Sequence, residues 1–176
     1  NHENYQDLIE EYLKIGSEIF DLETGIVSHI EDNNYTVMGT NVTDGTIIKG
    51  MVFDLEGTYC FEVYSSNSSV ALTAIGKNKK LCKHPVYLAM KLETYISAPI
   101  FVHEKLYGTI NFTSLKIRKD GFFSYELEIL ELMALNIGKM IEFQELKEKV
   151  EKQKNFYEDI LNSMHNGYFV QEKSGM

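Results

Sequence analysis

Cysteine and long apolar runs are scarce in this chain of 176 residues, and each scarcity excludes a class of protein. The two cysteines, Cys60 and Cys82, form neither a disulfide framework nor a zinc site by themselves, so we expect reduced thiols in a cytoplasmic protein. No segment reaches the roughly 18 to 20 consecutive apolar residues of a membrane span, and the acidic, amphipathic start does not resemble a signal peptide. We therefore expect no direct membrane contact in this stretch.

Basic residues are scarce as well. There are 17 Lys and Arg against 26 Asp and Glu, which gives a formal net charge of −9. A nucleic-acid-binding surface needs clustered Lys and Arg, so we expect no nucleic-acid partner. Hydrophobic residues make up 44% of the chain, which is enough to fill the core of one domain with an appendage.

The stretch from Tyr95 to Ser114 predicts the central hairpin of a sheet. The side chains of residues 95–102 point alternately to two faces, and both faces are apolar. Residues 106–113 alternate in the same way but are apolar on one face only. A strand that is apolar on both faces belongs at the centre of a sheet. Gly108 removes a side chain where another element can approach closely, and Pro99 is expected at a bulge or an unpaired position.

Hydrophobic periodicity predicts the other elements of an α+β fold, with an antiparallel sheet of about six strands and helices grouped on one side. Asp54 is expected to cap the second helix, and Gly16 to end the first. The expected helices are 4–16, 55–64, 85–90 and a long one from Ser124; the expected strands are 19–30, 35–38, a short one at 46–48, 70–75 and the hairpin.

The last helix carries a heptad pattern. Residues 139–166 contain neither Gly nor Pro, and a helix from Ser124 to about Met164 would be on the order of 60 Å long at about 1.5 Å per residue. We expect its second half to pair with another copy of the chain, together with the helix Tyr5–Ile15. An isolated charged linker helix is the alternative. The seam of the expected homodimer runs through Phe143, Leu146, Val150, Gln153, Tyr157, Ile160 and Met164.

Several of these segments resemble a GAF domain, a small-molecule-sensing relative of the PAS fold, over about residues 4 to 145. The resemblance rests on the hairpin residues 95–100 and 106–112, on the approach from His84 through Tyr87, and on the helix that begins at Phe123-Ser124. It implies a sensor module and leaves the ligand unknown.

The tail, from Ile160 through Asn166-Gly167-Tyr168 to Gly175, is similar to the opening of a PAS domain, of which only the first strand would be present. The expected organisation is a GAF sensor domain at 1–145, a coiled-coil signalling helix at 146–163 and a truncated PAS start at 164–176. Multi-sensor histidine kinases of two-component systems are built in this way. No phospho-accepting His motif or ATP-binding motif lies in this stretch, so the effector activity is expected elsewhere.

The resemblance implies a pocket between the sheet and the loops and helices that follow the second and third strands. The matched polar contacts of a cyclic-nucleotide site cannot be placed. The alternative is that the same residues fill the core and leave no cavity. The implied walls are mostly apolar and aromatic: Phe53, Tyr59, Val63, Ile75, Tyr87, Tyr95, Ala98, Ile110 and Phe112.

Cofactor attachment is not expected. Phytochrome-like relatives attach a bilin to a Cys beside a His, just before a Tyr-Leu pair, and Pro85 takes the place of that Cys in His84-Pro85-Val86-Tyr87-Leu88. Cys82 is a substitute thiol two residues earlier. His84 as an axial haem ligand, with Cys60 or Cys82 as redox partner, is a further alternative that we do not favour.

The sequence contains no Ser-His-Asp set, phosphate-binding loop or paired carboxylates, so we expect no enzymatic activity. The leading hypothesis is a regulatory ligand-sensing module that relays its state through a dimeric helix. The alternatives are a structural dimerisation and relay module without a ligand, and a haem or redox sensor.

Overall fold

The computed structural model describes the backbone of residues 4–173 and the side chains up to residue 164. The chain divides into two compact units, one that ends at Ile141 and one that begins at Glu142. Each unit is described by itself.

A six-stranded sheet in the order β3-β2-β1-β6-β5-β4 forms the centre of the first unit. Every neighbouring pair is antiparallel, and the hairpin β5–β6 lies inside the sheet, as the sequence predicts. The strands are β1 (Thr24–Glu31), β2 (Asn34–Thr40), β3 (Val52–Asp54), β4 (Val70–Thr73), β5 (Thr94–Val102) and β6 (Lys105–Ser114).

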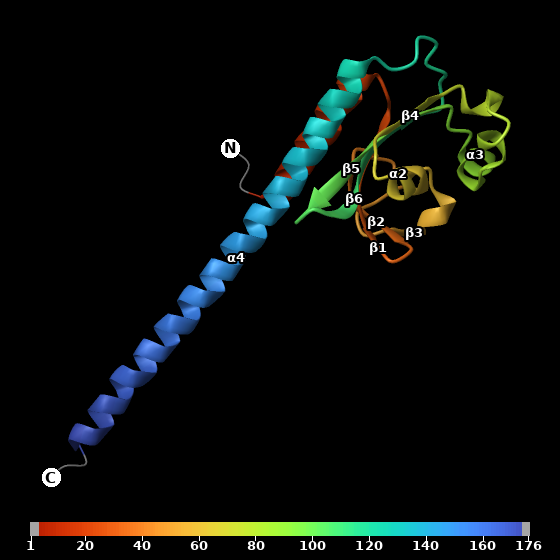
Figure 1. The fold of residues 1–176 in the computed structure, drawn as a ribbon. Helices are drawn as coiled ribbons and strands as arrows, with labels where there is room; N and C mark the ends of the chain where they lie inside the picture. The colour runs from red at the N-terminus through yellow and green to blue at the C-terminus, as the bar shows by residue number, and fades with distance from the viewer. Residues whose placement is uncertain (1–3, 174–176) are drawn as a thin grey trace. The chain divides into compact units, whose positions relative to one another are not determined.

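Helices cover both faces of the sheet, and not one face as the sequence predicted (Figure 1). The helix α1 (Tyr5–Phe20) and the start of α4 (Ser124–Lys173) share one hydrophobic core with one face of β5 and β6. The other face holds a second core together with α2 (Cys60–Ser66), α3 (Pro85–Met90) and the 3-10 turns η1 (Leu55–Gly57), η2 (Ile75–Lys77) and η3 (Leu81–Lys83). Because β5 is buried between the two cores, it is apolar on both of its faces.

Pro99 and Gly108 occupy the special positions that the sequence assigns to them. The pairing of β4 with β5 ends at Ser97, so Pro99 has no β4 partner that needs its missing N–H. A Cβ atom on Gly108 would lie 1.8 Å from the Ser28 backbone oxygen of the neighbouring strand β1. Only glycine therefore allows β6 to pair with β1 at this point.

Several predicted elements differ from the structure. The strand expected at 19–30 begins only at Thr24, because Ile19 and Phe20 still belong to α1. The first helix does not end at Gly16 but continues to Phe20, where Asp21 in the left-handed conformation caps it. The predicted helix 55–64 is broken into η1 and α2 because Thr58 has an extended backbone, and Asp54 makes no side-chain cap bond. The short strand expected at 46–48 lies instead at 52–54, since β3 pairs with residues 34–36 of β2.

The second unit consists of the continuation of α4 to Lys173. The first strand of a PAS domain was expected in this tail, whereas the backbone is helical up to Lys173. A strand needs a neighbour for its backbone hydrogen bonds, and the described part of the chain offers none there. Residues 174–176 of the expected PAS start lie outside the described residues. In the part of the chain that the structure describes, no helix is long and apolar enough to cross a membrane.

Candidate functional site

A cavity of about 520 Å³ lies on the α2–α3 side of the sheet. Strands β1, β2, β5 and β6 contribute one wall, the loop 41–51 the rim, and η1, α2 and α3 the opposite wall. The lining residues are Thr24, Ile26, Tyr35, Val42, Asp44, Thr46, Ile47, Phe53, Asp54, Gly57, Thr58, Tyr59, Cys60, Pro85, Val86, Ala89, Met90, Leu92, Tyr95, Asn111 and Thr113.

The deep wall is a buried polar network around the Cys60 thiol. The Tyr95 hydroxyl donates to Cys60 Sγ at 3.2 Å, and Asn111 Nδ2 lies 3.6 Å from the same sulfur. Asn111 Nδ2 also donates to the Tyr35 hydroxyl at 2.9 Å. On the next strand pair, the hydroxyls of Ser28 and Thr109 lie 3.0 Å apart. These bonds fix side chains from four strands and one helix, so the wall is pre-organised.

Burial keeps this network neutral. Desolvation raises the pKa of the Cys60 thiol, although hydrogen bonds from Thr109 and Tyr95 oppose the change. Desolvation also raises the pKa values of Tyr35 and Tyr95 well above 10, with a further contribution from Cys60. A neutral thiol is a poor nucleophile, so burial disfavours thiolate chemistry at Cys60.

Aromatic rings form the apolar part of the cavity. Tyr59 meets Tyr95 edge to face, with ring centroids 5.4 Å apart, and Tyr35 lies 6.3 Å from Phe53. The Tyr59 hydroxyl is buried and has no hydrogen-bond partner among the residues that the structure describes. Burial first, and then the charge interactions with Tyr87 and Glu93, raise the pKa of Tyr59 to about 12.

Two carboxylates lie at the solvent-exposed rim. Asp44 accepts hydrogen bonds from the backbone N–H of Thr46 at 2.9 Å and from its hydroxyl at 2.6 Å, and these bonds lower the pKa of Asp44. Asp54 accepts a hydrogen bond from Asn33 Nδ2. Among the residues that line the cavity there is no Lys, Arg or His. The rim is therefore negative.

The structure places the nine predicted pocket residues in three groups. Phe53, Tyr59 and Tyr95 line the cavity. Val63 and Ile75 lie in the core on the same face without lining it, and Tyr87 packs against that core while its hydroxyl donates to Glu93 at 2.8 Å. Ala98, Ile110 and Phe112 lie in the other core, beneath α1 and α4, so their predicted place in the cavity wall is wrong.

The error follows from the two-residue period of a strand. Tyr95 faces the cavity, so Ala98, three positions later on the same strand, faces away from it. On β6 the cavity face belongs to Asn111 and Thr113, which the prediction missed. A signal was available in the sequence, because polar residues alternate along an otherwise buried strand only where that face meets polar groups or a cavity.

The residues considered for cofactors do not fit those groups. Pro85 lines the cavity, whereas Cys82 does not line it and its thiol lies 3.7 Å from the Lys79 carbonyl oxygen. His84 does not line the cavity either. Its Nδ1 accepts the Val86 N–H at the start of α3, and its ring packs on Tyr59, with ring centroids 4.9 Å apart. In the described residues, no group of three His, Cys, Asp or Glu side chains is placed to hold a metal ion.

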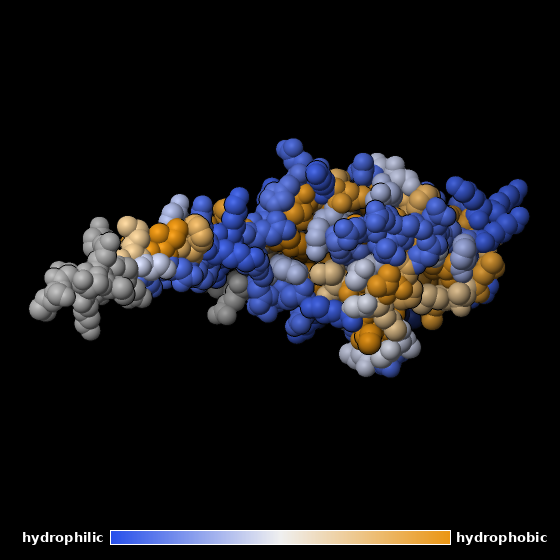
Figure 2. Space-filling view, turned by 90° about the horizontal axis from the view of Figure 1, so that it is seen from below, coloured by the Kyte–Doolittle hydropathy of each residue, from blue (hydrophilic) through white to orange (hydrophobic). Residues whose placement is uncertain are grey.

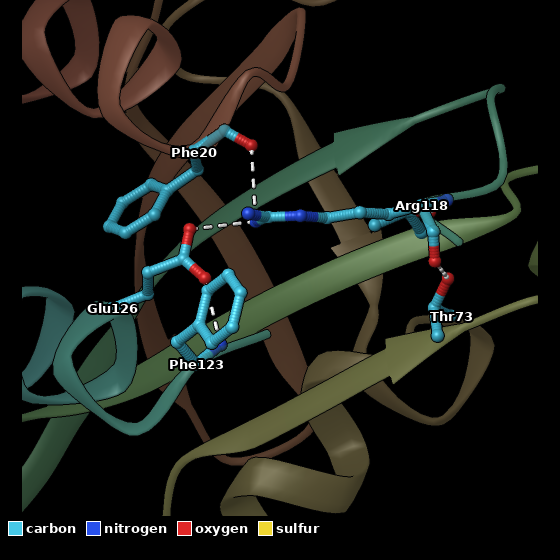
Figure 3. A network of polar contacts seen from close by, with 6 residues as sticks. Phe20, Thr73, Arg118, Phe123 and Glu126 are labelled. Atoms are coloured by element: carbon cyan, nitrogen blue, oxygen red, sulfur yellow. Dashed lines mark hydrogen bonds and ion pairs between the residues drawn. The ribbon is translucent and has the colours of Figure 1, made fainter. Parts of the chain in front are cut away.

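A second polar network joins the sheet to the two helices on its other face (Figure 3). Arg118 Nη1 lies 2.8 Å from Glu126 Oε1 on α4 and 3.4 Å from the Phe20 carbonyl oxygen at the end of α1. The Thr73 hydroxyl of β4 donates to the Arg118 carbonyl at 2.7 Å. Glu126 Oε2 accepts the Phe123 N–H at 2.8 Å and so caps α4, the role that the sequence assigned to Ser124.

A sequence-family model for the GAF domain matches residues 4–141, which is most of the chain. This chain belongs to the GAF domain family. The family consists of sensor modules of signalling proteins, and the observed α+β fold with six antiparallel strands and a long C-terminal helix agrees with it.

Solved structures of other GAF domains share this fold. The PixJ GAF domain of Thermosynechococcus elongatus in its blue-light-absorbing form is 20% identical, with a TM-score of 0.68 over 85% of this chain and 91% of that one. The phycocyanobilin-bound GAF domain of a cyanobacterial phytochrome is 14% identical, with a TM-score of 0.66 over 82% and 87%. The GAF domain of an Acinetobacter phosphoenolpyruvate-protein phosphotransferase is 9% identical, with a TM-score of 0.68 over 85% and 89%. A comparison with curated protein sequences gives no significant match.

Proposed function

We propose that this GAF domain is the ligand-sensing module of a cytoplasmic signalling protein of the sensor histidine kinase type. A small molecule binds in the cavity on one face of the sheet, and its presence changes the packing of α1 and α4 on the other. The observation that supports this proposal is the cavity of about 520 Å³, whose wall includes β5 and β6. The same two strands carry the core residues under α1 and α4, so movement of either strand reaches both helices.

In this proposal the relay continues along α4. The seam residues Leu146, Val150 and Tyr157 are exposed in the single chain, with 59%, 57% and 58% of their surface accessible. Hydrophobic side chains are visible on the surface of α4 in Figure 2. Exposed apolar residues at heptad spacing favour a partner helix, so we propose a homodimer through the seam of α4. The apolar residues of α1, which the sequence also suggested for the interface, pack into the core of the domain instead. Gln153 within the seam would fix the register of the two helices. The segment after the seam would begin a PAS domain that receives the signal.

A search for the ligand tests the sensing role directly. Native mass spectrometry of the purified chain, followed by a thermal-shift screen of nucleotides and metabolites, is expected to find a retained or a stabilising compound. A ligand at a hundredfold excess over its Kd stabilises the folded state by about 2.7 kcal/mol. Ala89→Trp, on the α3 side of the cavity, should abolish the shift because the ring occupies the cavity.

The neighbouring residue supplies the control. Leu88 is 60% exposed and does not line the cavity, so Leu88→Trp should leave the shift unchanged. A wide panel without any retained or stabilising compound would contradict the sensing role and favour a dimerisation and relay module. A visible absorption spectrum of the purified protein distinguishes the sensing module and the relay module from a haem or bilin sensor, which would absorb visible light.

A further inference from the structure

We propose that the cavity takes an organic cation with a flat aromatic body and rejects organic anions. This inference rests on the proposed sensing function, since it names the chemical class of the ligand for the same cavity. It derives from the charges at the rim, the aromatic walls and the hydrogen-bonding group left open inside.

The charge at the rim is of one sign. Asp44 and Asp54 are the charged residues among those that line the cavity, and both are exposed. Hydrogen bonds from Thr46 keep Asp44 ionised at neutral pH. The nearby cations are engaged elsewhere: Lys49 Nζ donates to Gln6 Oε1 at 2.7 Å, and Lys91 lies 4.8 Å from the centroid of the Tyr87 ring. A carboxylate or phosphate ligand would therefore meet two negative groups without a lining cation.

The aromatic residues favour a flat, positively charged guest. Tyr35, Phe53, Tyr59 and Tyr95 line the cavity, and Phe53 lies at its exposed edge with 39% of its surface accessible. The faces of such rings are negative, so they attract a cation and stack on a flat body. The apolar side chains of Ile26, Ile47 and Leu92 complete this part of the wall.

The open polar group lies deeper. The two donor contacts of Asn111 Nδ2 go to Tyr35 and Cys60, and among the described residues nothing donates to Asn111 Oδ1. Asn111 is 3% exposed and lines the cavity, so this oxygen is an acceptor for an N–H group of the ligand. A buried polar group without a partner costs free energy that a ligand can recover.

Charge-matched three-ring probes test the class. The probes are 9-aminoacridine as the cation, 9-anthracenemethanol as the neutral analogue and 9-anthracenecarboxylate as the anion, each titrated by fluorescence into the whole chain. We expect 9-aminoacridine to bind at least about tenfold more tightly than the carboxylate. The double variant Asp44→Asn with Asp54→Asn should weaken the cation about fivefold, as expected for two exposed charges, and leave the methanol unchanged.

The control is Asp120→Asn, which removes an exposed carboxylate that does not line the cavity and should change none of the three affinities. The proposed class is overturned if the carboxylate binds as tightly as the acridine, or if none of the probes reaches saturation at millimolar concentration. The sensing function survives both results when the native mass-spectrometry screen still finds a compound. It fails only when that screen is empty too.

Discussion

Asn111 and Phe112 are neighbours on β6 that face opposite cores of the GAF domain. Asn111 lines the cavity, whereas Phe112 is fully buried beneath α1, with its ring centroid 5.2 Å from that of Phe20. A Cβ atom on Gly16 of α1 would lie 2.2 Å from Phe112 Cζ, so the helix touches this ring without a side chain in between. A shift of β6 by a few tenths of an ångström therefore changes the packing of α1, since close-packed interiors transmit strain.

The contact between β1 and β6 depends on Gly108. We expect Gly108→Ala to destabilise the domain by more than about 3 kcal/mol, because its Cβ atom would meet the Ser28 backbone oxygen at 1.8 Å and a backbone cannot yield as a side chain does. Chemical denaturation monitored by circular dichroism measures the change. Gly57→Ala is the control: its Cβ atom would lie 3.9 Å from the nearest atom, so its effect should stay within about 0.5 kcal/mol. Equal effects of the two would contradict this account of the sheet.

The ion pair between Arg118 and Glu126 is expected to stabilise the junction of α1, β6 and α4. The side chain of Glu126 is 2% exposed, so Glu126→Gln should cost about 1–3 kcal/mol through the lost charge opposite Arg118. The pair Lys116–Glu23 offers a matched comparison, because its side chains are 83% and 52% exposed and Glu23→Gln should cost less than about 1 kcal/mol. Thermal unfolding of both variants checks the difference, which would be absent if the buried pair had no structural role.

Buried tyrosines with and without partners should respond in opposite ways to loss of the hydroxyl. Tyr35→Phe leaves a donor of Asn111 without its acceptor and should destabilise by about 1–2 kcal/mol. Tyr59→Phe removes a hydroxyl that has no partner, so the free energy of unfolding should stay the same or rise by up to about 1 kcal/mol. Urea denaturation of the two variants decides this, and a large loss for Tyr59→Phe would reveal a bond that the structure does not contain.

Much of the fold could be predicted because it depends on local patterns, whereas only part of the cavity wall could, namely Phe53, Tyr59 and Tyr95. The apolar alternation of residues 95–102 and the placement of Pro99 and Gly108 depend on strand geometry alone. The cavity wall depends on which strand face meets α1, and Tyr95 and Ala98 cannot share a face three residues apart on a regular strand. The loop 41–51 carries no periodic pattern, so its contribution of Asp44 and Ile47 to the cavity arises only from tertiary packing.

The raised pKa of Cys60 predicts how stability depends on pH. Burial holds the thiol neutral in the folded state, so the folded chain keeps a proton that the unfolded chain loses above its pKa of about 8.5. The free energy of unfolding should therefore fall as the pH rises from about 8.5 toward 9.5. Cys60→Ser should flatten this decline, whereas Cys82→Ser, which changes a partly exposed thiol, should not. Guanidinium denaturation at several pH values measures both slopes, and an unchanged slope in Cys60→Ser would contradict the assignment.

The proposed dimer through α4 is open to a direct test at Leu146. This residue lies on the expected seam and is 59% exposed in the single chain, so Leu146→Lys places a charge where two apolar side chains would meet. Sedimentation at micromolar concentration should show a dimer for the parent chain and a shift toward monomer for the variant. Lys152→Glu reverses a charge at an exposed position that neither belongs to the seam nor flanks it, and serves as the control. A monomeric parent chain, together with no effect of Leu146→Lys, would contradict the proposed dimer and favour a linker helix.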